Sequence, residues 1–266
     1  MNSHDHQKFS LQENLVTYEL PINEKARNFL RMEYFCSQID TYTAREKLES
    51  GATVSLLIEL SDFINRSDLR KDLITELERA ANAFSIFSGN PQVDPNNLKK
   101  VIATIKDSLA TLKSREYNPG ICIKSDELIH QVRQKSSSQK GVNKFDLPHF
   151  FFWSNLSQDE KIFQIAKWMA DILPLKNATA LMLEIIRGSS VTSFETASEG
   201  FFQRSLDKEK VSYLLRFSLP MPLPVFPEVS GGKHRFTVRF FHHYDTSSKP
   251  KQTSEAIQFQ LQICNI

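Results

Sequence analysis

Cysteine and glycine are scarce in this chain, and their spacing argues against several kinds of site. Only three cysteines occur in 266 residues, at Cys36, Cys122 and Cys264, and none forms a CxxC pair. A zinc site or a disulfide framework is therefore not indicated, and we expect buried free thiols in a reducing cytosol. The eight glycines form neither GxGxxG nor a phosphate loop, and GxSxG does not occur. The sequence thus gives no support for a Gly-rich dinucleotide fold or an elbow-type serine hydrolase.

Long apolar runs and an excess of one charge are also missing. No stretch approaches the roughly 20 apolar residues that a membrane span needs. The first six residues do not follow the charged-then-apolar pattern of a secretion signal. We therefore expect a cytoplasmic protein without a membrane span. Lysine and arginine total 33 against 31 acidic residues, a net charge of +2, so any binding of anions must come from local clusters of cations.

The histidines offer one segment that resembles a metal site. His242 and His243 precede Tyr244 and Asp245, but adjacent side chains of a strand point to opposite faces of the sheet. The two imidazoles would therefore not share one ion. We expect no metal, no cofactor and no catalytic residues, and hence no enzyme.

Hydrophobic periodicity predicts a strand, then helices, then strands. Apolar residues alternate over 16–22, and helical spacing follows behind the capping residue Asn23. Further helix starts are indicated by Asp94 before Pro95, and by Ser157 with Glu160 three residues later. Alternation returns after the last helix, which is predicted over 181–187, and covers 211–219, 236–240 and 257–263.

This order of elements predicts an α+β fold, because helices and strands are segregated along the chain. About seven helices are expected in a helical domain over 23–190. A lone N-terminal strand would not be stable, so it should pair with the C-terminal strands. The expected β domain is therefore antiparallel and discontinuous, built from 15–22 and 191–266.

A row of cations on one predicted strand is the most informative feature. With Phe236, Val238 and Phe240 facing the core, the outward face carries Lys233, Arg235, Thr237 and Arg239. Guanidinium groups on a rigid strand are suited to hold carboxylates or phosphates. The alternative is an ordinary solvated sheet face.

Two further basic pairs stand in the helical part. Arg66 and Arg70 lie around the predicted turn before the third helix, where Glu76 and Glu78 could neutralise them. Arg27 and Arg31 lie one helical turn apart, and their aliphatic stems could simply cover apolar surface.

Five segments resemble the ZapD family of cell division proteins, and they occur in the order found in that family. They are PINEKARNFLRMEYF (21–35), DFINRSDLRKDLITELER (62–79), KFDLPHFFFW (144–153), LEIIRGSS (183–190) and GGKHRFTVRF (231–240). The resemblance extends from about residue 15 to 264. It implies a homodimer that binds the C-terminal tail of the tubulin-like protein FtsZ, bundles FtsZ protofilaments at the mid-cell Z-ring and lowers FtsZ GTPase activity.

The resemblance also implies site residues. Arginines that the family uses in bundling correspond to Arg66, Arg235, Arg239 and Arg31 here. The chain departs from enteric relatives at Glu127, where they carry a basic residue, and at Phe151, where they carry a histidine. Lys124, Arg133 or His149 could compensate for these two changes. The residues expected to bind FtsZ are Arg31, Arg66, Arg70, Arg133, His149, Lys233, Arg235 and Arg239.

Two rival hypotheses belong to other classes. A nucleic-acid-binding protein could use the basic strand 233–239 with an exposed aromatic such as Phe241, but the low net charge and the missing nucleic-acid motif argue against this partner. An enzyme could bring His149, Asp146 and Tyr244 together on folding, although nothing in their spacing requires it.

Overall fold

The chain forms two compact units in a computed structural model. The structure describes residues 15–44, 48–86, 94–136, 146–232 and 234–266. One unit, called the β unit below, comprises the chain up to Arg27 together with Ile186–Ile266. The other, called the helical unit, comprises Asn28–Ile185.

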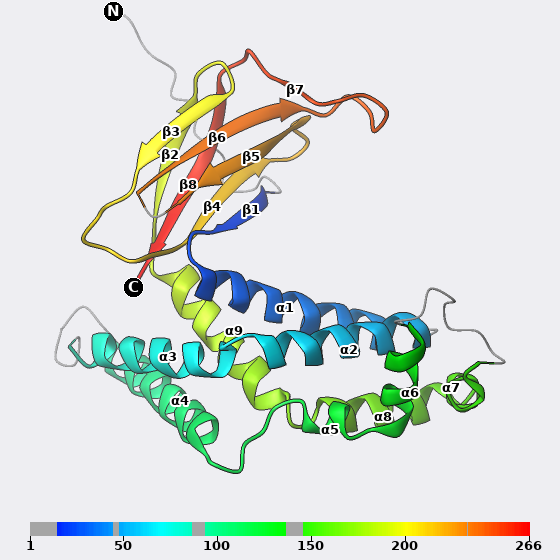
Figure 1. Cartoon of the computed structure of the whole chain (residues 1–266). Coiled ribbons are helices and arrows are strands. Elements are labelled where there is room, and N and C mark those ends of the chain that lie inside the picture. Colours follow the sequence, from blue (N-terminus) through cyan, green and yellow to red (C-terminus); the bar gives the residue numbers. More distant parts are fainter. Residues whose placement is uncertain (1–14, 45–47, 87–93, 137–145, 233) are drawn as a thin grey trace, which may run out of the picture. The chain divides into compact units, whose positions relative to one another are not determined.

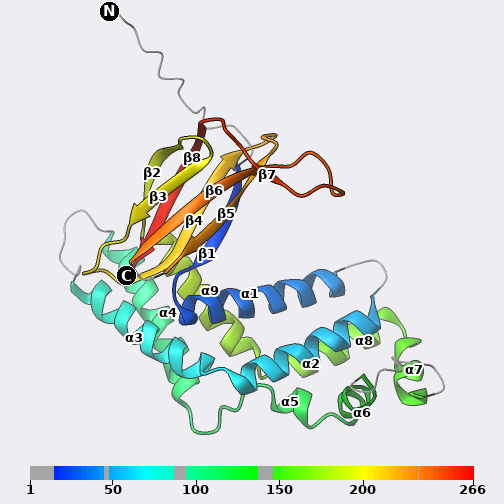
Figure 2. The same ribbon diagram turned by 45° about the horizontal axis from the view of Figure 1, so that its top comes forward.

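Two antiparallel sheets make up the β unit (Figure 1 and Figure 2). One sheet has the strand order β1-β4-β8-β2, and the other has the order β3-β6-β5, with β7 also paired to β6. The strands are β1 (Leu15–Pro21), β2 (Ser190–Ala197), β3 (Phe201–Ser205), β4 (Ser212–Pro220), β5 (Val225–Gly231), β6 (Arg235–His242), β7 (Lys251–Gln252) and β8 (Ile257–Asn265). Together with the helices, these strands confirm the predicted α+β class.

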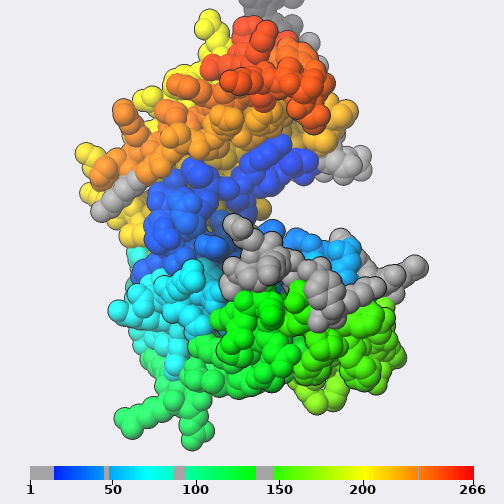
Figure 3. Space-filling model, turned by 45° about the vertical axis from the view of Figure 1, so that its right-hand side comes forward, coloured from blue at the N-terminus to red at the C-terminus, as the bar shows by residue number. Residues whose placement is uncertain are grey.

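Strand β1 joins the C-terminal strands as expected. It pairs antiparallel with β4 from Leu15 opposite Pro220 to Pro21 opposite Leu214. The Thr17 and Ser218 hydroxyls lie 2.7 Å apart across this pair. Figure 3 shows β1 in blue, in contact with strands coloured gold to orange that lie near the other end of the sequence. Pairing with β4 gives the isolated first strand the hydrogen-bond partners that it lacks by itself.

Phenylalanine fills the space between the two sheets. The Phe217 ring lies 5.9 Å from that of Phe236 and 6.0 Å from that of Phe259, measured between centroids. The Phe240 and Phe259 rings are 5.2 Å apart, and all four side chains are buried. Aromatic pairs at these distances add stability beyond the area that they bury. This core fixes which face of β6 points outward.

Nine helices lie in the part of the chain that the structure describes, against about seven expected. They are α1 (Glu24–Thr43), α2 (Ser50–Arg66), α3 (Leu69–Ile86), α4 (Pro95–Lys113), α5 (Ile121–Lys124), α6 (Glu127–Ser136), α7 (Pro148–Ser154), α8 (Gln158–Met169) and α9 (Leu173–Gly188). The short helices α5 and α7 were not expected, because four and seven residues are too few to show a helical period. The last helix begins at Leu173 rather than at residue 181, since Pro174 is tolerated in a first helical turn.

The predicted helix starts are found at three caps. The Asn23 side chain accepts a hydrogen bond of 2.8 Å from the Ala26 amide, and Asp94 accepts one of 2.9 Å from the Asn96 amide. Ser157 and Glu160 form the expected capping box. These bonds satisfy amides that a helix leaves without intrahelical partners.

Candidate functional site

The cations of β6 lie on its solvent side. Phe236, Val238 and Phe240 are fully buried, whereas Arg235 and Arg239 are exposed, as the alternation predicts. Neither arginine makes a side-chain hydrogen bond or an ion pair with another described residue. Their Cα atoms are separated by roughly 13 Å, the length of four extended residues. Lys233, also expected in this row, lies outside the described residues.

Aromatic rings flank these arginines. Phe201 on β3 lies directly opposite Arg239, and 39% of its surface is exposed. On the other neighbour, β5, the Phe226 ring stacks on Phe241 with centroids 6.0 Å apart. Residues opposite each other in an antiparallel pair have Cβ atoms about 5 Å apart. We call the outward surface of Arg235, Arg239, Phe201, Phe226 and Phe241 the β6 face.

One carboxylate lies near the β6 face without forming an ion pair with its arginines. Glu228 on β5 lies opposite Arg239, yet no ion pair between the two is found within 4.0 Å. The β6 face therefore presents two guanidinium groups beside the exposed ring of Phe201 and the half-buried rings of Phe226 and Phe241. Such a surface can attract an anionic ligand through charge and hold an apolar side chain through burial.

Phe201 and Phe226 were missed in the sequence analysis. Both lie on strands whose partner and register depend on the fold, so no local pattern connects them with β6. Strand β3, for example, is joined to β6 through an antiparallel register that runs from Phe201 opposite Arg239 to Ser205 opposite Arg235.

Two of the expected arginines of the helical unit are exposed. Arg66 ends α2 and makes no side-chain hydrogen bond or ion pair within the described chain. The Arg31 guanidinium lies over the rings of Phe35, at 5.7 Å, and Phe63, at 5.2 Å. Cation–π contacts of this kind orient a guanidinium group while leaving its edge open to a ligand.

Arg70 differs from Arg66 because its guanidinium group is engaged by the backbone. Its guanidinium nitrogens donate hydrogen bonds of 2.7, 2.8 and 2.8 Å to the carbonyls of Leu112, Tyr117 and Ser114. It also lies over the Tyr117 ring, 5.3 Å from the centroid. All three guanidinium nitrogens are thus engaged in hydrogen bonds to backbone carbonyls in and beyond the last turn of α4. The expectation that Arg66 and Arg70 act as one basic pair does not fit this geometry.

The remaining expected residues are spread over several helices. Arg133 on α6 donates a hydrogen bond of 2.8 Å to the Asp62 carboxylate, and His149 is exposed in the first turn of α7. Glu127 accepts a hydrogen bond of 2.9 Å from Gln131, and Phe151 is 39% exposed. A carboxylate and a phenyl ring thus stand at the two positions where the resemblance led us to expect basic residues.

The segment that begins at His242, the last residue of β6, is held by contacts among its own side chains. The His242 ring stacks on Tyr244 with centroids 5.2 Å apart. The Asp245 carboxylate accepts hydrogen bonds from the hydroxyls and amides of Ser247 and Ser248, which lower its pKa to about 2. Within the described ranges, no three or more His, Cys, Asp and Glu side chains gather as they would around a metal ion.

None of the described helices combines the length and the apolar composition that a membrane span requires.

Comparison with known proteins identifies the family. The model of the family described as "ZapD: Cell division protein" matches residues 30–239. A cell division protein ZapD from Methylococcus capsulatus is 32% identical over 252 residues, which cover 94% of this chain and 98% of that protein. Both matches include the segment that carries Arg66 and the greater part of β6. The chain therefore belongs to the ZapD family of cell division proteins.

Proposed function

We propose that this protein is a non-enzymatic division factor that binds the C-terminal tail of FtsZ. The observation that carries the proposal is the β6 face, where Arg235 and Arg239 are exposed and make no ion pair with another described residue. A guanidinium group without an internal carboxylate partner is available for an acidic peptide. The apolar rings beside it can bury a hydrophobic residue of the same peptide.

Binding leads to bundling if the protein is a homodimer. Two tail sites related by a two-fold axis can attach to two filaments, because each filament displays many tails. After the first attachment, the second is effectively intramolecular, so the avidity exceeds the affinity of one site. Bundling would concentrate the protein in the cytoplasm at the mid-cell Z-ring. Lower GTPase activity of FtsZ would follow from slower filament turnover.

Arg66 and Arg31 are proposed as further tail contacts, on the helical unit. Both are exposed, and both correspond to arginines that the family uses. Arg133 and His149 are included as weaker candidates, since Arg133 already pairs with Asp62. Arg70 is proposed as a structural residue, because its nitrogens are engaged by backbone carbonyls.

Co-sedimentation with FtsZ filaments tests the proposal. The double variant Arg235→Glu/Arg239→Glu should lose most bundling, because it reverses both charges of the β6 face. The matched control is Lys249→Glu/Lys251→Glu, which makes the same change of charge at two exposed residues of the β unit and should bundle normally. Undiminished bundling by a folded Arg235/Arg239 variant would remove the assigned role of this face.

A nucleic acid is the alternative partner. Cations beside aromatic rings also bind single strands, by backbone contacts and base stacking. The net charge of +2 provides little long-range attraction for a polyanion. A gel-shift assay with single-stranded DNA at physiological salt distinguishes the two: we expect no shift, and a shift lost in the Arg235/Arg239 variant would favour nucleic acid.

A further inference from the structure

An exposed carboxylate lies in the same row of side chains as Arg239. Glu228 on β5 is exposed, and its side chain makes no hydrogen bond or ion pair with another described residue. It lies directly opposite Arg239, and Phe201 lies opposite Arg239 on the other side. Residues opposite each other in antiparallel strands share one face of the sheet, with Cβ atoms about 5 Å apart. An apolar ring, a cation and an anion therefore follow one another across β3, β6 and β5.

Glu228 can be reached from the side away from Arg239. Strand β5 is the last strand of its sheet, so no further described strand flanks the carboxylate there. The preceding residue, Pro227, has no backbone N–H, and a proline within an edge strand hinders the addition of another strand. A ligand that contacts Glu228 therefore lies on the face of the sheet and binds through side chains, so the pattern of charges on that face decides which ligand fits.

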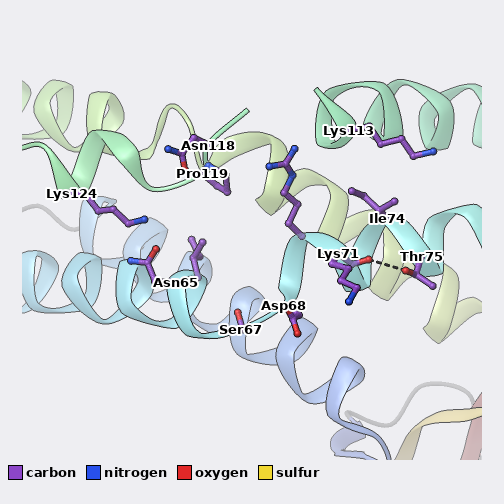
Figure 4. A pocket seen from close by; sticks show the side chains of 12 residues that line it. Asn65, Ser67, Asp68, Lys71, Ile74, Thr75, Lys113, Asn118, Pro119 and Lys124 are labelled. Carbon is purple, nitrogen blue, oxygen red and sulfur yellow. Dashed lines mark hydrogen bonds between the residues drawn. The ribbon is translucent and has the colours of Figure 1, made fainter. Parts of the chain in front are cut away.

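The fold accounts for a comparable carboxylate elsewhere but not for Glu228. Asp68 is exposed and lines a hollow of the helical unit together with Lys71 and Lys124 (Figure 4). Asp68 directly precedes α3, where the N-terminus of a helix stabilises a negative charge. Glu228 lies in the middle of a strand, where no helix end stabilises it. Its charge is therefore available for contact with a ligand.

The row of Phe201, Arg239 and Glu228 distinguishes ligands by the signs of their charges. A peptide that carries only acidic residues is attracted by Arg239 and repelled by Glu228. A peptide with a basic residue beside an acidic one can form an ion pair with each of them. Like charges that face each other across an interface discriminate against the wrong partner. A polyanion such as a nucleic acid is disfavoured for the same reason as a purely acidic peptide.

We propose that Glu228 is a specificity-determining residue of the β6 face and pairs with a lysine or arginine of the bound peptide. The inference rests on the proposed binding of an FtsZ tail and adds a chemical requirement to it. The bound segment carries charges of both signs. Its acidic residue lies at Arg239, its basic residue lies at Glu228, and an apolar residue packs against Phe201.

Fluorescence anisotropy with a labelled FtsZ tail peptide at physiological salt tests this role. A second peptide, the base-free tail, has every lysine and arginine replaced by glutamine. Glu228→Gln should bind the unaltered tail about two- to fivefold more weakly than wild type does, which is the effect of one exposed ion pair. It should bind the base-free tail as tightly as wild type or more tightly, because this peptide offers the carboxylate no basic partner.

The matched control is Glu209→Gln. It makes the same change of charge at an exposed residue between β3 and β4 and should bind both peptides like wild type. Circular dichroism verifies that each variant is folded. If Glu228 only weakens the attraction exerted by Arg239, Glu228→Gln binds the unaltered tail more tightly, and the proposal is overturned. It is also overturned if the substitution weakens both peptides equally or leaves the affinity for both unchanged.

The Arg235→Glu/Arg239→Glu variant, titrated with the same peptides, distinguishes this inference from the proposed function. If that variant binds the tail like wild type, the β6 face is not the tail site, and both proposals fail. If it loses the tail while Glu228→Gln retains wild-type affinity for it, the tail site stands and only the role of Glu228 is wrong.

Discussion

Glu19 and Arg216 lie opposite each other on β1 and β4 and form an ion pair across 197 residues of sequence. The Arg216 Nε donates a hydrogen bond of 2.9 Å to Glu19 Oε1. Arg187, at the end of α9, donates bonds of 2.9 and 2.8 Å to the two oxygens of the same carboxylate. Arg216 also donates a hydrogen bond of 2.8 Å to the side-chain oxygen of Gln262 on β8. The side-chain nitrogen of Gln262 in turn donates one of 3.1 Å to the Thr192 hydroxyl on β2. One polar row therefore crosses all four strands of this sheet.

Glu19→Gln should destabilise the protein. The substitution keeps the shape of the side chain but leaves two partly buried guanidinium groups facing a neutral amide. Because the three side chains are only 20–27% exposed, we expect a loss of about 1–3 kcal/mol in the free energy of unfolding. Urea denaturation followed by far-UV circular dichroism measures this loss. The control Glu24→Gln breaks an exposed pair with Arg27 and should cost less than about 0.5 kcal/mol.

The stabilisation by Glu19 should depend on pH. Burial of this carboxyl favours its neutral form, but the hydrogen bonds and charges of Arg187 and Arg216 outweigh burial and lower the pKa below its usual 4.5. A lowered pKa in the folded state stabilises the fold above the unfolded-state pKa, and this stabilisation is lost as the pH falls through the folded-state pKa. The difference in the free energy of unfolding between wild type and Glu19→Gln should therefore be largest at pH 6 to 7 and should decrease below pH 4.5. A difference that stays constant down to pH 3 would contradict this assignment.

Arg70→Lys should destabilise the helical unit although it keeps the charge. A lysine cannot reproduce three hydrogen bonds to carbonyls in and beyond the last turn of α4, so we expect a loss of about 2–3 kcal/mol in the free energy of unfolding. Trp153 and Trp168, the only tryptophans of the chain, both lie in the helical unit, so fluorescence during urea unfolding reports on this unit. Arg66→Lys is the matched control, and it should change stability by less than about 0.5 kcal/mol, as exposed substitutions usually do. Equal stability of the two variants would show that the Arg70 contacts contribute little.

Phe201→Ala should weaken binding of an FtsZ tail peptide without changing its salt dependence. Loss of an exposed ring beside Arg239 should cost about 1 kcal/mol, or roughly fivefold in Kd. Arg239→Gln should instead reduce the slope of affinity against salt, because it removes a solvent-exposed charge that salt screens. Fluorescence anisotropy with a labelled peptide at several salt concentrations measures both effects. Val191→Ala, at an 81% exposed position of β2, is the control for loss of an exposed apolar side chain. A Phe201→Ala protein that binds like this control would remove the ring from the site.

Local patterns in the sequence determined which face of a strand is buried and where several helices begin. Alternation along β6 was enough to predict that Phe236 and Phe240 are buried and that Arg235 and Arg239 are exposed, because neighbouring residues of a strand always point to opposite sides. The caps at Asn23, Asp94 and Ser157 could be predicted for a similar reason, since their partners lie two or three residues away. The resemblance to one family was likewise contained in short segments.

Only the tertiary structure decided which elements meet. Phe201 lies beside Arg239 because of the register between β3 and β6, and Arg70 is engaged because the end of α4, 42 to 47 residues away in sequence, packs against α3. Such contacts depend on how the core packs and on which strands exchange hydrogen bonds. The spacing of apolar residues along a single segment indicates neither of these. For this reason the sequence could predict that the arginines of β6 face outward, whereas folding determined which cations are free to bind and which hold the chain together.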